Sequence, residues 1–265
     1  MPSPPDPSQL NDPSRRPPRP HRPTGSHGPP PDPELRVRLT RPEDIPAIIT
    51  LSRQVYGPGG AWLTPELYAH QAAFPEGQLL IREGRGGPIL GFAVTLIIDS
   101  SRFSLQASWD EITADGRLTT HEPRAGDTLY GAGIAVHPHA RGRGIGRRLY
   151  GAREALTERL GLARIRAGAR IPGYRQVSRI MDPFHYVHEV AEGIRRDPTL
   201  SFQLHMGFQV LGVALDYLPL DRESLGHAAV VEWTPGGGSG HGGGLPSPGE
   251  PNRDDDSQEE SPPED

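Results

Sequence analysis

A glycine-rich run with several arginines lies near the middle of the sequence, at residues 136–149, and reads VHPHARGRGIGRRL. Glycine stands at every second position from 142 to 146, and apolar residues then recur at helical spacing over 145–160. Glycine lets backbone N–H groups approach a ligand closely, and the first turn of a helix offers unpaired N–H donors at the positive end of its dipole. Loops of this kind bind anions, usually a phosphate or pyrophosphate. The run therefore predicts a phosphate-binding loop.

Two widespread phosphate-binding patterns do not match this run. The dinucleotide fingerprint G-x-G-x-x-G fails, because its third glycine would fall at Arg147. A P-loop places a lysine directly after its last glycine, and the chain contains no lysine. The pattern R-x-x-G-x-G does fit, with Arg141, Gly144 and Gly146 following an apolar stretch that ends at Val136. A glycine-rich turn that only caps a helix is the alternative interpretation.

The elements expected around the loop form a series of strands and helices. The hydrophobic patterns predict strands over 35–39, 78–82, 89–98, 128–136, 163–171, 208–215 and 228–233, and helices over 45–55, 64–75, 142–160 and 183–206. Residues 40–43 are expected to form a capping box for the first helix, and residues 99–127 an irregular excursion over the surface. This order predicts an α/β fold, with a mixed sheet and helices on both of its faces.

The loop and the order of elements together resemble the GNAT superfamily of N-acetyltransferases, in which R-x-x-G-x-G marks the coenzyme A pyrophosphate loop. The resemblance covers residues 35–234. Four longer strings resemble, more narrowly, the GNAT domains that are fused to a nitrilase-type carbon–nitrogen hydrolase: AGDTLYG at 125–131, RIPGY at 170–174, DPTLSFQL at 197–204 and ESLGH at 223–227. The resemblance implies the GNAT fold, a mixed and mostly antiparallel sheet flanked by helices, with two splayed central strands.

The resemblance also implies acetyl-CoA as the cosubstrate. In the family, acetyl-CoA lies between the strand that ends at Val136 and the strand over 163–171. Its pantetheine arm adds to the open edge of the first strand, and a backbone N–H near Ala135 or Val136 would polarise the thioester carbonyl. Carried onto this sequence, the coenzyme-binding residues are Ala135, Val136, Arg141, Gly142, Arg143, Gly144, Ile145, Gly146, Arg147 and Arg148.

The general acid of the family has no direct counterpart in this chain. Many members carry a tyrosine shortly before a Lys/Arg-x-Gly-Phe turn. Here the turn is at 206–208 and the matching position is Gln203, whose amide cannot serve as a proton donor of that kind. We expect Tyr174, at the end of a predicted strand, to replace it, ahead of Tyr130 and His205. A packing role with a bonded hydroxyl is the alternative for Tyr174.

The remaining chemistry is constrained mostly by what the sequence lacks. It contains no cysteine, so an acetyl-enzyme on sulfur is excluded, and we expect the amine to attack directly in a ternary complex. No carboxylate stands at an inner position of 128–136, so the base is left open. His137 suits that role as an imidazole, but it could equally cap the turn. Scattered histidines without a carboxylate cluster predict no metal site.

Both ends of the chain differ in composition from its middle. Residues 1–34 hold 13 of the 31 prolines, and residues 235–265 run from glycine-rich to acidic. Neither segment has enough apolar residues for a core, so both are predicted to be disordered tails around a single GNAT domain at 35–234. No apolar run approaches 18 residues and no signal peptide is evident, which predicts a cytoplasmic protein that does not span a membrane.

Local charge leaves more than one function class open. The net charge is −5, but residues 141–179 hold eleven arginines and two glutamates. Part of this charge suits the phosphates of coenzyme A. A nucleic-acid surface is the weaker interpretation, since no series of aromatic residues is interleaved with the arginines. We therefore expect an N-acetyltransferase acting on a small-molecule or protein amine. A catalytically weak acetyl-CoA-binding regulator and an RNA- or partner-binding scaffold are the alternatives, and a homodimer is left open.

Overall fold

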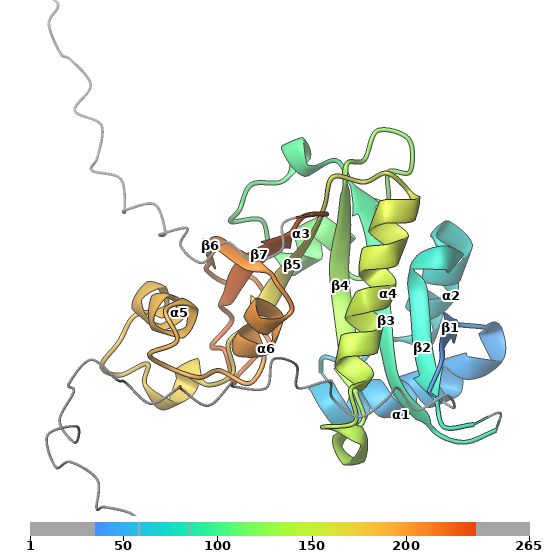
Figure 1. Cartoon of the computed structure of the whole chain (residues 1–265), viewed down its shortest axis with the longest axis horizontal. Coiled ribbons are helices and arrows are strands. Elements are labelled where there is room, and N and C mark those ends of the chain that lie inside the picture. Colours follow the sequence, from blue (N-terminus) through green and yellow to red (C-terminus); the bar gives the residue numbers. More distant parts are fainter. Residues whose placement is uncertain (1–34, 58, 85, 237–265) are drawn as a thin grey trace, which may run out of the picture. The chain divides into compact units, whose positions relative to one another are not determined.

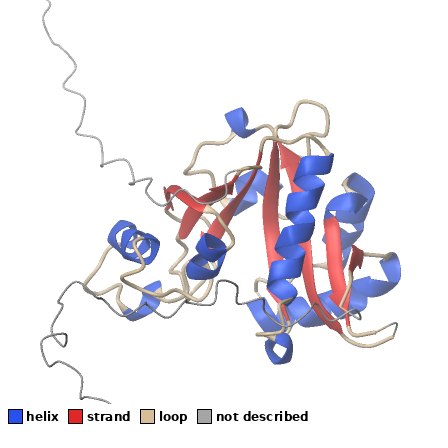
Figure 2. Ribbon diagram, viewed as in Figure 1, coloured by secondary structure: helices blue, strands red, loops and turns tan. Residues whose placement is uncertain are grey.

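The computed structural model describes residues 35–57, 59–84 and 86–236. The predicted tail at 1–34, and all but the first two residues of the predicted tail at 235–265, lie outside the described residues. The described part is built from strands covered by helices (Figure 2). It contains the predicted strands and helices in their predicted order.

Seven strands form one sheet in the order β1-β2-β3-β4-β5-β7-β6. The strands are β1 (Val37–Leu39), β2 (Gln78–Arg82), β3 (Ile89–Ile98), β4 (Thr128–Val136), β5 (Arg164–Arg170), β6 (Gln209–Ala214) and β7 (Ala228–Trp233). Neighbouring strands are antiparallel except β4 and β5, which are parallel. The predicted mixed, mostly antiparallel sheet is confirmed.

The central strands β4 and β5 pair only where they begin. Thr128–Tyr130 of β4 lie opposite Arg164–Arg166 of β5, and no later residues of the two strands pair. Farther along, β4 stays beside β3, while β5 stays beside β7. Figure 1 shows the two strands meeting at the top of the view and separating below. The predicted splay is therefore present, and it leaves one edge of β4 without a partner strand over 131–136.

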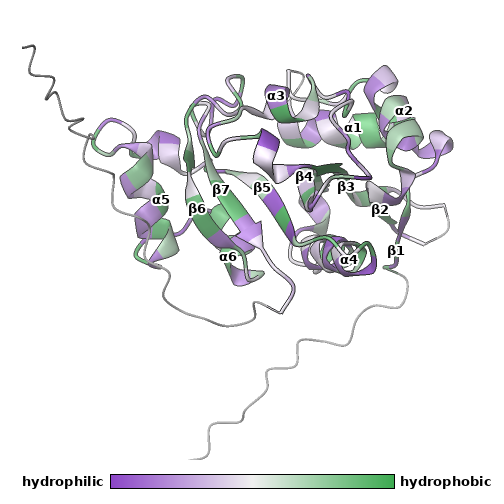
Figure 3. Ribbon diagram, turned by 90° about the horizontal axis from the view of Figure 1, so that it is seen from above, coloured by the Kyte–Doolittle hydropathy of each residue, from purple (hydrophilic) through white to green (hydrophobic). Residues whose placement is uncertain are grey.

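Helices cover both faces of the sheet. They are α1 (Ile45–Tyr56), α2 (Thr64–Ala73), α3 (Trp109–Thr113), α4 (Ile145–Arg159), α5 (Pro183–Ala191) and α6 (Leu200–His205). Figure 3 shows α1, α2 and α3 on one side of the sheet, and α4 and α6 on the other. The apolar stripe of α4 packs on the sheet through Ile145, Leu149 and Leu156, each at most 4% exposed. This packing fixes the glycine-rich loop at the ends of the central strands.

Two expected elements differ in detail. The excursion at 99–127 is not wholly irregular, because it contains α3. The predicted helix over 183–206 is two helices, because α5 ends at Ala191, shortly before Gly193 with its φ of +72°, and α6 begins only at Leu200. The Asp197 carboxylate accepts hydrogen bonds from the N–H groups of Thr199 and Leu200, at 2.8 and 2.9 Å, and so starts a new helix.

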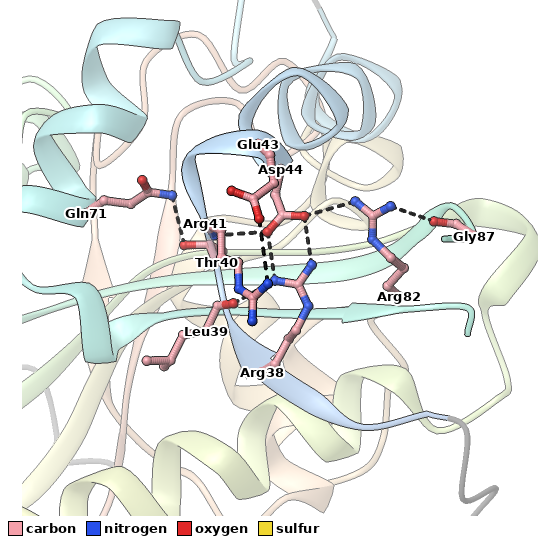
Figure 4. A network of polar contacts seen from close by, with 9 residues as sticks. All are labelled: Arg38, Leu39, Thr40, Arg41, Glu43, Asp44, Gln71, Arg82 and Gly87. Atoms are coloured by element: carbon pink, nitrogen blue, oxygen red, sulfur yellow. Dashed lines mark hydrogen bonds and ion pairs between the residues drawn. The ribbon is translucent and has the colours of Figure 1, made fainter. Parts of the chain in front are cut away.

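The start of α1 is stabilised by a different residue from the one expected. The predicted capping box at 40–43 is wrong, because the carboxylate that accepts the Arg41 N–H, at 2.9 Å, is that of Asp44. Arg38 and Arg82 also bind this buried carboxylate, at 2.7 and 2.9 Å (Figure 4). Burial favours the neutral acid, but the hydrogen bonds from Arg38 and Arg41 hold the pKa of Asp44 below its ordinary value. Asp44 thus joins β1, β2 and the start of α1.

Candidate functional site

The glycine-rich loop has the geometry of an anion-binding site. Gly142 and Gly144 have φ angles of +79° and +76°, and a Cβ placed on either would meet no atom within 4 Å. The first helical hydrogen bond of α4 runs from the Arg148 N–H to the Gly144 carbonyl, at 3.1 Å. The N–H groups of the helical residues 145–147 therefore have no hydrogen-bond acceptor within the helix. Three such donors at the positive end of a helix suit a pyrophosphate.

The arginines of the loop surround this space. Arg141, Arg143 and Arg147 are exposed. Arg143 forms an ion pair with Glu83 at 2.9 Å, and Arg147 lies 3.5 Å from a ring nitrogen of His205 in α6. The predicted coenzyme-binding residues at 141–148 thus lie together, as the sequence indicates, and remain the predicted site.

The open edge of β4 presents the backbone of alternate residues. His137 donates its N–H to the Leu90 carbonyl of β3 at 2.8 Å. Because N–H groups alternate sides along a strand, Ala135 also faces β3, whereas Ile134 and Val136 face the gap toward β5. Of the two predicted residues, Val136 therefore has its N–H in the gap and Ala135 does not. The N–H of Ile134, which was not predicted, also faces the gap. The Nδ1 atom of His137 accepts the His139 N–H at 3.3 Å, so this imidazole caps the turn as the plainer interpretation expected.

One tyrosine hydroxyl occupies the edge at Ile134. Tyr56, the last residue of α1, donates its O–H to the Ile134 carbonyl at 2.5 Å and accepts the Ile134 N–H at 3.2 Å. Burial of the hydroxyl raises the pKa of Tyr56 to about 12. Sequence reasoning missed Tyr56, since it lies 78 residues before its partner and belongs to no local motif.

A buried guanidinium lies beneath the same stretch of β4. Arg153 of α4 is 1% exposed, and its Nη2 donates to the carbonyls of Gly133 and Val94 at 2.5 and 3.1 Å. Its guanidinium also lies over the ring of Tyr150, 5.4 Å from the centroid. Within residues 35–57, 59–84 and 86–236, no carboxylate lies at ion-pair distance from Arg153. This sets Arg153 apart, because buried charges in proteins are usually paired.

Gln203, at the position of the family tyrosine, is buried and hydrogen-bonded to a tyrosine of α4. It is 4% exposed, and its Nε2 donates to the Tyr150 hydroxyl at 2.8 Å. Its Oε1 is buried without a partner among the described residues. Burial raises the pKa of Tyr150, so that hydroxyl stays protonated near neutral pH.

Tyr174, the predicted acid, lies in the turn that follows β5. Its ring packs against Tyr186 and His227, with centroids 5.6 and 5.9 Å away. Burial, together with the charge of Asp182, raises its pKa. Tyr174 lines an open hollow of about 610 Å³ together with Ser178, Ile180, Met181, Asp182, Pro183 and His185. In the described part of the chain, no hydrogen bond or ring contact joins Tyr174 to Gln203, Val136 or the glycine loop.

The weaker candidate residues also have structural partners. The Tyr130 hydroxyl is hydrogen-bonded to that of Tyr217, and Asp127 at the start of β4 accepts two hydrogen bonds from Ser100. Over the described ranges, no group of three His, Asp or Glu side chains is arranged to hold a metal ion. In the same ranges, no helix combines the length and apolar character that crossing a membrane requires.

Comparison with known proteins identifies the family. The model of the acetyltransferase (GNAT) family matches residues 45–176. The chain is 34% identical, over 203 residues, to the uncharacterized N-acetyltransferase YkwB of Bacillus subtilis (strain 168), covering 75% of this chain and 88% of that protein. The chain belongs to the GNAT acetyltransferase family. Membership of this family supports acyl transfer in general, and GNAT domains bind acetyl-CoA, the predicted cosubstrate.

A second relative supports the narrower resemblance. The probable hydrolase YhcX of Bacillus subtilis (strain 168) is 36% identical over 200 residues, which are 76% of this chain but only 38% of that protein. A match to little more than a third of a protein named as a hydrolase agrees with the predicted likeness to GNAT domains fused to hydrolases.

Solved structures share the fold at low sequence identity. The GNAT-like decarboxylase GphF, in complex with isobutyryl-CoA, has a TM-score of 0.64 and 23% identity, covering 75% of this chain and 98% of that one. The loading GNATL domain of CurA from Lyngbya majuscula has a TM-score of 0.65 and 20% identity, covering 76% of this chain and 97% of that one. At these identities the likeness establishes the fold alone.

Proposed function

We propose that the protein transfers the acetyl group of acetyl-CoA to the amine of a small molecule or a protein, by direct attack within a ternary complex. The observation that carries this proposal is that two features meet where β4 and β5 separate. The open edge of β4 leads directly to the anion-binding loop at the start of α4. A linear ligand with amides along its length and a pyrophosphate at one end fits both features.

The residues of the site support each part of this reaction. The N–H groups at 145–147 and the exposed arginines suit the pyrophosphate, and the backbone of Val136 suits an amide of the pantetheine arm. The amine nitrogen forms a bond to the thioester carbon, the carbon–sulfur bond breaks, and the coenzyme leaves as a thiolate. A thiol with a pKa of about 8.5 is a tolerable leaving group near neutral pH, so transfer does not depend on a tyrosine at Gln203.

The pairing of the arginines favours the coenzyme over nucleic acid as the ligand. Five of the eleven arginines between 141 and 179 form ion pairs with carboxylates of this chain: Arg143, Arg159, Arg164, Arg166 and Arg170. These pairs balance much of the local positive charge, which weakens the case for a phosphate-backbone surface.

The experiment that tests the proposal combines a binding measurement with turnover on a panel of amines, followed by release of free thiol from acetyl-CoA. We expect wild type to bind with a free energy of about −4 to −8 kcal/mol. Gly144→Val should weaken binding by at least about tenfold, because its side chain would fill the space over the loop donors.

Gly161→Val is the matched control. Gly161 follows the other end of α4 and has a φ of +66°, and a Cβ placed on it, as on Gly144, would meet no atom within 4 Å. Both substitutions place valine in the left-handed region, at a similar cost of about 1–2 kcal/mol in stability. Equal binding by the two variants would make the loop a helix cap only. Acetyl-CoA binding without turnover on any amine would favour the regulatory alternative, which the buried hydrogen bond of Gln203 supports.

A further inference from the structure

The Tyr56 hydroxyl lies where an acyl-CoA thioester would need to bind. Ile134 turns its N–H and its carbonyl toward the gap between β4 and β5, and both groups are bonded to this single hydroxyl. A ligand that adds to the open edge of β4 must therefore replace the Tyr56 oxygen as the acceptor of the Ile134 N–H. That exchange leaves the hydroxyl beside the incoming carbonyl oxygen, because both oxygens compete for the same donor.

We propose that Tyr56 is a catalytic residue of the acyl transfer, whose O–H turns from the Ile134 carbonyl to the carbonyl oxygen of the thioester and binds that oxygen together with the Ile134 N–H. This inference rests on the proposed function and adds a side-chain donor to the backbone donor. Two donors aimed at one oxygen form an oxyanion hole, and their hydrogen bonds strengthen as negative charge develops on that oxygen.

Tyr56 acts as a hydrogen-bond donor and keeps its proton throughout. Burial raises its pKa to about 12, although the charges of Arg170 and Arg153 oppose the shift, so the hydroxyl stays neutral near pH 7. When the amine nitrogen bonds to the carbonyl carbon, the π electrons of the carbonyl move onto oxygen and are stabilised by the two donors. When the carbonyl re-forms, the carbon–sulfur bond breaks and its electron pair leaves on sulfur. The nitrogen loses one proton and the thiolate gains one, so the products are an amide and a free thiol.

The charge beneath the strand suits the same step. Arg153 is almost fully buried under Gly133, the residue before Ile134, and it has no carboxylate partner among the described residues. A buried cation is costly unless a negative charge compensates it. The oxyanion supplies that charge only during the reaction, so the field of Arg153 favours the transition state over the ground state.

The closing experiment compares wild type with Tyr56→Phe, which removes the hydroxyl and keeps the ring. Tyr186→Phe is the matched control, because it also removes a buried tyrosine hydroxyl, one that donates to Asp197 at 2.8 Å. The first readout is kcat for the best amine of the panel, alongside the Kd for acetyl-CoA. The second is the infrared stretch of the thioester carbonyl in bound acetyl-CoA labelled with ¹³C at that carbon, which requires no turnover. Thermal unfolding confirms that each variant is folded.

We expect Tyr56→Phe to lower kcat by about a hundredfold to a thousandfold with no loss of acetyl-CoA affinity, whereas Tyr186→Phe leaves kcat within about twofold of wild type. Bound wild type should shift the carbonyl stretch to lower frequency, and Tyr56→Phe should reduce that shift. An unchanged stretch or an unchanged kcat in Tyr56→Phe overturns the role of Tyr56. A wild type that transfers to no amine, but whose shift still depends on Tyr56, overturns the proposed function and supports donation by Tyr56. Failure of wild type to bind acetyl-CoA overturns both.

Discussion

The buried imidazole of His70 should make the stability of the protein depend on pH in a defined window. His70 of α2 is fully buried, and its Nε2 donates to the Gly116 carbonyl at 2.6 Å. Its Nδ1 is buried without a partner in the described part of the chain. The ring meets Trp62 edge-on, with centroids 4.9 Å apart. Such a site has no acceptor for a second proton, so burial lowers the pKa of His70 to about 4.

The size of this pH effect on stability follows from the difference between the pKa values of His70 in the folded and unfolded states. An unfolded histidine has a pKa of about 6.5, so the unfolded chain gains a proton at His70 before the folded chain does. The stability contributed by neutral His70 is complete above pH 6.5 and is lost as the pH falls from 6.5 toward 4. The expected loss is about 2 kcal/mol at pH 5 and about 3 kcal/mol when the pH reaches 4.

Urea unfolding of wild type and His70→Gln at pH 7.5, 6, 5 and 4.5 measures this loss. The glutamine amide can still donate to Gly116 but does not titrate, so subtracting the two curves removes the contribution of all carboxylates. We expect the stability difference between the two proteins to change by about 2 kcal/mol between pH 7.5 and 5, to the disadvantage of wild type at low pH. Parallel curves for the two proteins would refute a buried, neutral His70.

Two further predictions concern the site. Glu83→Gln removes the carboxylate that competes with the coenzyme phosphates for Arg143. We therefore expect the Kd for acetyl-CoA to fall about two- to fivefold at low ionic strength. Titration at a second, high salt concentration should show no gain in affinity. Tyr174→Phe should lower kcat by about tenfold or more, with an unchanged Kd for acetyl-CoA, if Tyr174 is the general acid. A fall of less than about threefold in steady-state assays would leave its ring as packing against Tyr186 and His227.

Short-range patterns in the sequence were sufficient for the order of the strands and of the longer helices, and they predict the loop. The apolar stripe of α4 and the unbroken apolar run of β3 repeat over neighbouring positions, and strand and helix geometry follows from such repeats. Glycines at 142 and 144 likewise indicate a tight approach of backbone to ligand, and both have positive φ. The sequence itself therefore determined the fold class and the family, and it predicts the position of the coenzyme loop.

The surroundings of the reacting bond depended on tertiary structure. The register of β4 against β3 decides which N–H groups of β4 face the gap. A shift of one position turns the other set of N–H groups toward it, which is why the sequence pointed to Ala135 and missed Ile134. Tyr56 reaches Ile134 across 78 positions, and Arg153 reaches the neighbouring Gly133 from the opposite face of the sheet. Contacts of this kind join elements that share no local pattern. They form only when packing brings separate faces together, and so only the tertiary structure decided them.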